Sequence, residues 1–448
     1  MRAGLGARRL AWTVVLAAVL VAAVAVPAAA AVPGELDPRF GVGGTAMTEF
    51  PSSYSGARAV AVQADGRVVA AGFAHTDNSI LQDVALVRYD PSGVLDPTFG
   101  DGGRVRTDFG GRFDDALAVA VQSDGRIVVA GSSSDATGTV MAVARYTRDG
   151  RLDGSFDGDG MALVDFGGEA VARAVALQRD GKLVLAGWAV RPLATGCCAA
   201  DFALARLSPA GRLDRSFGRD GRVMTDFLPG IENGQDTAGA VLVQGDGRIL
   251  AVGSAIAGGG SPDFGVARYR GDGSLDPTFG GDGRVSTDFV GDRDEVRDLA
   301  VDPYGRVVVG GQSCQPPGPF DEVCDFALAR YDASGRLDRR FGDHGKVRTD
   351  LGAVVGEGVR GLILQRDGRI VVAGDTQGPG GADVGLARYR PDGRLDLTFG
   401  SGGVVITSVS PATDEVGGLA RGSADRLLVA GTTATAQSFG FFVSSYRS

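Results

Sequence analysis

The chain has 448 residues, of which 72 are Gly, 44% are apolar and 22% are charged, and its formal net charge is −9. This balance excludes a disordered chain, a collagen and a coiled coil, because the chain has enough apolar residues to bury a core and lacks their sequence periods. His75 and His344 are the only histidines, which argues against mechanisms built on a histidine cluster.

The first 31 residues predict a secretory signal peptide. Arg2, Arg8 and Arg9 precede an apolar run over 10–26, and Pro27 and the alanines at 28–31 follow it. A basic head, a short apolar stretch and an Ala-x-Ala end are typical of a cleaved signal. The alternative is an uncleaved membrane anchor, for which this run is short.

Residues 32–448 are then the mature protein, secreted or held in the cell envelope, with no transmembrane segment. Loss of 1–31 removes three arginines and no acid, so the mature net charge is −12. A net acidic surface disfavours nucleic acid as a partner. We expect a monomer.

A Leu-Asp-x-x-Phe pattern defines a repeat of about 60 residues. Its seven copies begin at Leu36, Leu95, Leu152, Leu213, Leu275, Leu337 and Leu395. Each repeat has two apolar runs around an Asp-Gly-type turn, as at 117–131, and two further β-rich runs. Asp-Gly between apolar runs is a hairpin signal, because Gly adopts positive φ without cost. Each repeat therefore predicts four strands: a before this turn, b after it, c with the Phe-Ala-Leu-Ala-Arg pattern, and d with the Thr-Asp-Phe pattern.

Seven groups of four short strands predict an all-β fold, a single seven-bladed β-propeller. The chain begins with a d strand at 44–50 and ends with a c strand at 441–447. The N-terminal strand is therefore expected to join the C-terminal blade and close the propeller, which removes a free sheet edge.

The repeat resembles the delta-60 repeat, a bacterial β-propeller family of uncharacterised function. The matching residues are the Leu-Asp-Pro-x-Phe-Gly starts at 36–41, 95–100 and 275–280, the Gln-x-Asp-Gly-Arg turn and the Ala-Arg-Tyr strand end. The resemblance covers about residues 34–448 and implies the propeller fold, but it supplies no catalytic residues. The seventh repeat departs most, since Ser445 replaces the recurring Arg.

The loops predict which face of the propeller functions. The a–b turns and c–d segments are nearly uniform, whereas the b–c loops (188–200 and 312–324, for example) and the d–a loops (228–238 against 167–169) differ in length and composition. The b–c and d–a loops of a four-stranded blade share one face. Function tends to lie in variable loops on a rigid scaffold, so this face is the predicted binding face.

Six acids precede the a strands and are candidate ligand-binding residues at the mouth of the channel: Asp115, Glu169, Asp236, Glu295, Glu357 and Glu415. A ring of carboxylates would suit a hard cation, and Ca²⁺ is the candidate cofactor. The alternative is that each acid accepts hydrogen bonds from loop backbone or pairs with a nearby Arg, such as Arg173, Arg297 or Arg360.

Other recurring residues predict scaffold roles. An Arg ends strand c in six repeats, from Arg88 to Arg388, with an Asp five residues earlier in five of them. We expect these arginines to make hydrogen bonds between blades, because a buried Arg must be paired. The repeat Phe residues, from Phe40 to Phe399, are expected to pack between blades.

All four cysteines lie in b–c loops. Cys314 and Cys324 flank one loop and are predicted to form a disulfide, while Cys197 and Cys198 either bridge each other or stay reduced. Trp188 is the only Trp after the signal. It either stacks on a sugar or packs within its loop.

Three functions remain open on these residues. The favoured one is a non-catalytic binding scaffold whose variable face takes a protein or glycan ligand. The alternatives are a structural envelope component and a carboxylate- or metal-dependent hydrolase or lyase, which would work without histidine, as glycosidases do.

Overall fold

The computed structural model describes residues 32–51, 54–76, 81–192, 198–229, 234–256, 260–289, 293–315, 323–352, 356–378, 380–434 and 438–448, with only the backbone at 192, 198 and 424. The chain divides into Met1–Ala31 and a compact unit, Val32–Ser448. The predicted signal peptide lies outside the described residues. Within them, no helix is long and apolar enough to cross a membrane.

The compact unit is all-β, as predicted, and consists of repeated four-stranded antiparallel arrangements in a propeller-like fold. The a strands are β2 (Ser55–Val62), β6 (Phe113–Val121), β10 (Ala170–Leu177), β14 (Thr237–Val243), β18 (Arg293–Val301), β22 (Gly358–Leu364) and β26 (Asp414–Arg421). The b strands are β3 (Val68–His75), β7 (Ile127–Asp135), β11 (Leu183–Pro192), β15 (Ile249–Ile256), β19 (Val307–Cys314), β23 (Ile370–Gly378) and β27 (Leu427–Ala434).

The c and d strands complete each arrangement. The c strands are β4 (Gln82–Tyr89), β8 (Gly138–Tyr146), β12 (Cys198–Leu207), β16 (Pro262–Tyr269), β20 (Cys324–Tyr331), β24 (Gly381–Tyr389) and β28 (Phe439–Tyr446). The short d strands are β1 (Thr45–Thr48), β5 (Arg104–Thr107), β9 (Met161–Val164), β13 (Arg222–Thr225), β17 (Arg284–Thr287), β21 (Lys346–Thr349) and β25 (Val404–Thr407).

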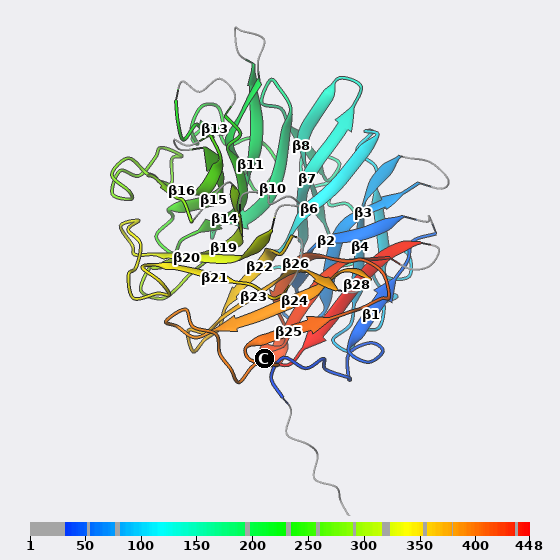
Figure 1. The fold of residues 1–448 in the computed structure, drawn as a ribbon. Coiled ribbons are helices and arrows are strands. Elements are labelled where there is room, and N and C mark those ends of the chain that lie inside the picture. Colours follow the sequence, from blue (N-terminus) through cyan, green and yellow to red (C-terminus); the bar gives the residue numbers. More distant parts are fainter. Residues whose placement is uncertain are drawn as a thin grey trace, which may run out of the picture. The chain divides into compact units, whose positions relative to one another are not determined.

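The described strands form six sheets, none of them closed on itself. Five sheets have four strands. The sixth has eight, because the parallel pair Gln82–Phe113 joins β2–β5 to β6–β9. In Figure 1 the sheets follow one another in chain order, and each a strand packs against the a strand of the next repeat.

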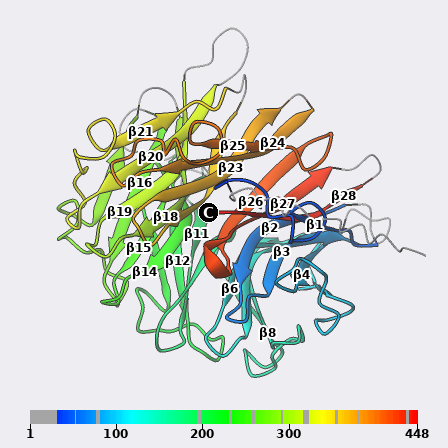
Figure 2. The ribbon, with the colours of Figure 1, turned by 90° about the horizontal axis from the view of Figure 1, so that it is seen from below.

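The first and last strands of the compact unit lie side by side. β1 pairs antiparallel with β28, with Thr45 opposite Ser444 and Thr48 opposite Phe441. Figure 2 shows the blue β1 and β2 beside the red β27 and β28. The N-terminal d strand therefore pairs with the C-terminal c strand, as the sequence predicts.

The Asp-Gly turns form as predicted, with Gly66 at a φ of 85°. The seventh repeat lacks this Gly, and its a–b turn is instead a 3-10 turn, η1 (Ser423–Asp425), in which Asp425 takes a φ of 60°. Asp is among the few side chains that tolerate this left-handed region. The last repeat thus keeps its hairpin with a different residue.

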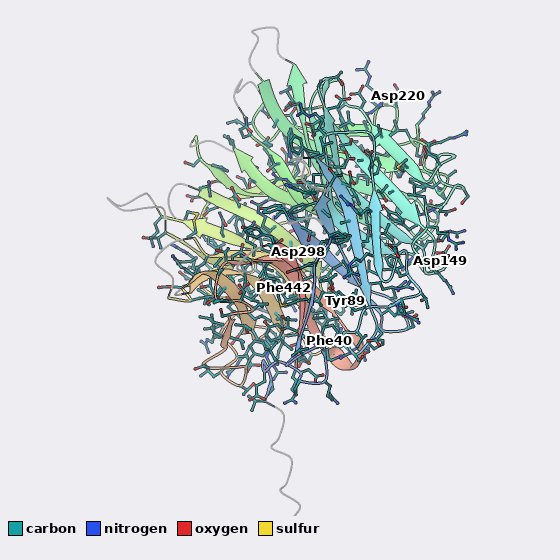
Figure 3. The ribbon with its side chains drawn as sticks, turned by 90° about the vertical axis from the view of Figure 1, so that its right-hand side faces the viewer. Phe40, Tyr89, Asp149, Asp220, Asp298 and Phe442 are labelled. Atoms are coloured by element: carbon teal, nitrogen blue, oxygen red, sulfur yellow. A yellow bond between two sulfur atoms is a disulfide. The ribbon has the colours of Figure 1, made fainter. Side chains whose placement is uncertain are left out.

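The core lies between successive sheets. Phe40 and Tyr89 are almost fully buried, and the Tyr89 hydroxyl donates a 2.7 Å hydrogen bond to Thr48. Figure 3 shows both residues within the body of the strands, whereas Asp149 and Asp220 lie in turns at its periphery. Four other repeats use the same pair, as with Tyr146 and Thr107, whereas the third repeat has Leu207 in place of the Tyr. A buried phenol needs such a partner.

The recurring Arg at the end of strand c connects neighbouring repeats, which confirms the predicted scaffold role. Arg145 pairs with Asp153 at 2.8 Å, donates a 2.5 Å hydrogen bond to the Pro209 carbonyl of the next repeat, and lies 4.8 Å from the Phe156 ring centroid. Its acidic partner is the Asp of the Leu-Asp-x-x-Phe pattern. A different Asp, which lies five residues before the Arg in five repeats, is near the start of strand c and is described with the candidate site.

Candidate functional site

Every a strand contains a β-bulge at the same place. The pairing of a with b skips one residue in each repeat, between Ala172 and Ala174 for example. The skipped residues are Arg58, Leu117, Arg173, Gly239, Arg297, Arg360 and Gly417. A bulge turns one side chain out of the regular alternation of a strand, and bulges are frequent beside functional sites. The fold thus re-aims one residue per repeat.

All seven bulged residues line one cavity of about 440 Å³. Trp188, Asp115, Asp375 and Glu415 line it as well, with Leu117, Val171 and Val416 as apolar parts of the wall. This volume is within the range of small-molecule sites, about 300–1,000 Å³. The cavity is the one described place where residues from all seven repeats converge.

Two of the bulged positions must be Gly. A Cβ atom on Gly417 would lie 2.4 Å from the Ala57 carbonyl oxygen, and one on Gly239 would lie 2.6 Å from the Val296 carbonyl oxygen. The backbone of a neighbouring repeat therefore fills the space that a side chain would need. The other five bulges carry side chains, and four of these are arginines.

Three of the four bulged arginines are paired with acids. Arg360 lies 2.7 Å from Asp375, and Arg297 lies 2.7 Å from Glu295. Arg58 bridges two carboxylates more loosely, at 3.8 Å from Asp115 and 3.6 Å from Glu415. Burial raises the pKa of Asp115 to about 6, although Arg58 opposes the shift.

Arg173 differs from the other three. Among the described residues it has no ion-pair or hydrogen-bond partner, and it is half-buried in the cavity wall. Burial, together with repulsion from Arg297, lowers the pKa of Arg173 to about 10, although the charge of Glu295 opposes the shift. Trp188 lies on the same wall, since it pairs with Val171, two residues before Arg173.

The six predicted mouth acids do not share one position, so the expected six-membered ring is not formed. Asp115 and Glu415 line the cavity, and Glu295 reaches it through Arg297. Asp236 and Glu357 are buried and accept hydrogen bonds from the amides of Phe227 and Leu351. Glu169 is exposed. The acids differ in position because they do not lie the same number of residues before the bulge. Side chains one residue apart on a strand point to opposite faces of the sheet.

The buried acids belong instead to a second repeated arrangement. In four repeats the Asp at the start of strand c, the Asp after strand d and the acid at the start of the next a strand have carboxylate atoms within 4.8 Å of one another. These groups are Asp83–Asp108–Asp114, Asp201–Asp226–Asp236, Asp263–Asp288–Asp294 and Asp325–Asp350–Glu357. Burial, reinforced by repulsion from Asp288 and Asp294, raises the pKa of Asp263 to about 6.

Such a group holds either a proton or a hard cation, since oxygen atoms are the ligands that Ca²⁺ takes. Burial raises the pKa of Asp201 to about 6, with Arg191 opposing the shift and Asp226 adding to it. Each of the four groups also contributes a carboxylate that accepts a backbone amide, as Asp294 does from Phe289 at 2.7 Å. The acids therefore fix the start of strand a. Calcium at the channel mouth stays a prediction.

The loop assignments from the sequence agree with the strand pairings. The start of strand c meets the d–a segment that leads into the next a strand, as where Ala200 bonds to residues 234 and 236. The b–c and d–a loops therefore lie at the same end of the sheets. The predicted disulfide between Cys314 and Cys324 is confirmed and joins the ends of β19 and β20. Cys197 and the side chain of Cys198 lie outside the described residues.

Sequence reasoning missed the bulges. It treated Arg173, Arg297 and Arg360 as local partners of acids and did not single out Arg58. A signal was present, because the a strands align as Ala-Arg-Ala at 57–59 and 172–174, Ala-Leu-Ala at 116–118 and Val-Arg at 296–297 and 359–360. One position is thus variable between small or apolar neighbours in every repeat except the fifth, where Asp298 follows Arg297.

Comparison with known proteins supports an uncharacterised β-propeller family. Residues 63–99, 122–156, 244–279 and 365–399 match the model described as "Domain of unknown function (DUF5122) beta-propeller". These matches cover the turn between strands a and b through the repeat Phe. A search of curated protein sequences finds no match.

Several solved structures resemble the chain at low identity. Sqt1 of Chaetomium thermophilum bound to the N-terminus of ribosomal protein L10 is 15% identical, with a TM-score of 0.48 over 90% of this chain and 99% of the other. The polysaccharide lyase Uly1 is 12% identical, with a TM-score of 0.46 over 89% and 90%. The Trypanosoma rangeli sialidase is 11% identical, with a TM-score of 0.38 over 90% and 59%. These structures assign no function to this chain.

Proposed function

We propose that this chain is an exported, seven-bladed β-propeller that acts as a non-catalytic binding scaffold. Its ligand, a protein or a glycan, enters at the end of the sheets that carries the b–c and d–a loops and contacts the central cavity. The observation that carries the proposal is the bulge in every a strand, which directs one residue per repeat, five of them with side chains, into a single cavity.

The number of blades and the closure are part of the proposal. Seven repeats each supply strands a, b and c, and a single bridging pair, Gln82–Phe113, is all that merges two of them into one sheet. Pairing of β1 with β28, and packing of β2 against β26, support closure between the first and last repeats. A closed propeller leaves only the short outer d strands as sheet edges, which supports a monomer.

A larger hollow of about 970 Å³ is a weaker candidate site. It lies along the outer strands β1 and β5 and is lined by Met47, Phe50 and Arg104. Only the first, second and last repeats contribute to it. The repeated, re-aimed residues of the central cavity favour that cavity instead.

A carboxylate-dependent hydrolase or lyase is the second candidate, because one specific observation favours it. Asp115 has a pKa of about 6, which suits a general acid near neutral pH, and Arg58 links it to a second carboxylate, Glu415. If this is the function, Asp115→Asn abolishes cleavage of the substrate. If the cavity only binds, Asp115→Asn leaves ligand binding intact and no cleavage is found in either protein.

The experiment that tests the proposal is affinity capture from culture medium and from cell envelope. It compares the chain over 32–448 with a variant in which the b–c loops are shortened to Gly-Ser links. A matched control shortens or replaces c–d segments at the opposite end of the sheets. A ligand that is kept by the native chain and the control, but lost by the loop variant, supports the proposal. Equal capture by all three contradicts it, and self-association without a ligand favours the envelope component.

A further inference from the structure

The central cavity contains one guanidinium, that of Arg173, which no described carboxylate contacts. The lining includes four arginines and three acids, Asp115, Asp375 and Glu415. Arg58 and Arg360 pair with lining acids, and Arg297 pairs with Glu295 behind the wall. Arg173 has no partner among the described residues. A half-buried guanidinium without a carboxylate in direct contact is unfavourable, so a bound anion would supply that contact.

We propose that the cavity binds the carboxylate of a uronic acid within an acidic polysaccharide or oligosaccharide. Arg173 holds the sugar carboxylate, and the sugar ring packs on Trp188. This inference rests on the proposed binding function of the same cavity and deepens it by naming the class of ligand.

The charge balance favours a carboxylate over a phosphate group. Asp115, Asp375, Glu415 and Glu295 already match the four arginines in number, and Arg173 alone lacks a contact. An anion with one charge therefore disturbs this balance less than a phosphate monoester, which would bring nearly two. The planar guanidinium presents parallel N–H donors that match the two oxygens of a carboxylate. The second negative charge of a phosphate group would lie near Asp375 and Glu415, which also line the cavity and would repel it.

The remaining polar groups favour a sugar over the carboxyl terminus of a protein. Asp115, Asp375 and Glu415 offer carboxylate oxygens that accept hydrogen bonds but donate none when ionised. Sugar hydroxyls supply several donors around one ring, whereas a peptide terminus supplies few. Trp188 adds a large, flat, apolar surface on the wall that also carries Arg173. The combination of donor, acceptors and indole fits a hydroxyl-rich anion.

Trp188 also provides the signal for a test, because it is the only Trp in the compact unit Val32–Ser448. The probes are trimers of galacturonate, mannuronate and guluronate, each paired with its methyl ester, which differs only in the charge of the carboxyl group. We expect saturable change in Trp188 fluorescence with at least one acidic trimer, and binding at least tenfold weaker for its methyl ester.

The matched variants are Arg173→Gln and Arg212→Gln. Arg212 is an exposed arginine on the c–d segment of the same repeat. Arg173→Gln is expected to weaken binding at least tenfold while its thermal melting temperature is unchanged or raised, and Arg212→Gln is expected to bind as the native chain does. Arg173→Lys, which keeps the charge but not the fork, is expected to fall between them.

Three results would overturn the inference. In the first, no acidic trimer binds saturably. In the second, an acidic trimer and its methyl ester bind equally well. In the third, Arg173→Gln leaves binding of the acidic trimer unchanged. A peptide with a free carboxyl terminus that binds in place of the trimers would also contradict it. If loop-dependent capture succeeds while the acidic trimers fail, the ligand class is wrong and the binding function stands. If both fail, the proposed function fails as well.

Discussion

The Arg360 guanidinium lies 2.7 Å from the Asp375 carboxylate, across the a and b strands of one repeat. Asp375 also accepts a 2.6 Å hydrogen bond from the Val416 amide of the next repeat. This ion pair therefore has two effects: it neutralises one bulged arginine, and it connects two repeats at the cavity. The corresponding arginine of the third repeat, Arg173, has no such partner in the part of the chain that the structure describes, and this difference gives the cavity its asymmetry.

Substitution of these two arginines should have opposite effects on stability. Arg360→Leu leaves Asp375 without its cation, and we expect the free energy of unfolding to fall by about 1–2 kcal/mol, since the pair is partly exposed. Arg173→Leu removes an unpaired charge and should leave the free energy of unfolding unchanged or higher. Urea denaturation measures both values. A loss of stability for Arg173→Leu equal to that for Arg360→Leu would show that Arg173 is paired after all.

The Arg that connects neighbouring repeats should matter more for stability than any cavity residue. Arg145→Met removes the ion pair with Asp153 and the hydrogen bond to the Pro209 carbonyl, leaving a buried acid with less compensation. We expect a loss of about 3 kcal/mol in the free energy of unfolding. Arg212→Met, on the surface, should lose less than about 0.5 kcal/mol. Similar losses for the two variants would contradict the scaffold role of Arg145.

Stability should pass through a maximum near pH 5. Asp201 and Asp263 have a pKa of about 6 in the folded protein against an ordinary value of 3.8. Their contribution is therefore present at low pH and is lost as the pH rises through 6. Asp96 is the opposite case: burial alone would raise its pKa, but the hydrogen bonds from Thr98 and the charge of Arg88 lower it. Its contribution is lost as the pH falls below about 4.

The variant Asp263→Asn separates the two effects. It should raise the free energy of unfolding at pH 7.5 by about 1–2 kcal/mol and change little at pH 4.5, because Asp263 is already protonated there. Asp220→Asn, in an exposed turn at positive φ where Asn also fits, is the control and should change neither value. Thermal denaturation across this pH range measures the effect. Destabilisation of Asp263→Asn at pH 7.5 would show that the charged carboxylate has a favourable partner.

The disulfide should stabilise the fifth repeat by closing a short loop. Cys314 and Cys324 are ten residues apart and paired across β19 and β20. Replacing both with Ala is expected to lower the free energy of unfolding by about 3 kcal/mol. For a test with dithiothreitol, Cys197→Ser and Cys198→Ser are first introduced into both proteins. In that background, dithiothreitol should cause a similar loss of stability in the protein that keeps Cys314 and Cys324, and none in the protein that has Ala at both positions. A double variant as stable as the native chain would contradict this contribution.

The sequence predicted the strands well because their signals are local. Asp-Gly turns such as Asp65-Gly66 mark five of the seven a–b hairpins, and the Leu-Asp-x-x-Phe pattern marks each repeat. The pairing of β1 with β28 followed from counting strands at the two ends of the chain. The merging of two repeats through Gln82 and Phe113 did not follow, because a single bridging pair depends on loop geometry rather than on a pattern.

The candidate site was harder to predict because it depends on single-residue shifts. A bulge moves Arg173 out of the strand alternation without changing the apolar pattern around it. The same alternation separates Asp114, which accepts the Phe109 amide, from Asp115 in the cavity. The sequence shows acids before six of the a strands, but a shift of one residue decides whether an acid faces the cavity or the sheet.

Quenching of Trp188 fluorescence by ions tests the central claim most directly, that Trp188 shares one solvent-accessible cavity with Arg173, an arginine that has no ion-pair partner among the described residues. Val32–Ser448 would be titrated with iodide and with caesium at constant ionic strength, alongside Arg173→Gln and Arg212→Gln. The account predicts stronger quenching by iodide than by caesium, a difference that Arg173→Gln reduces and Arg212→Gln preserves. Equal quenching by the two ions, or a difference that survives Arg173→Gln, would contradict it.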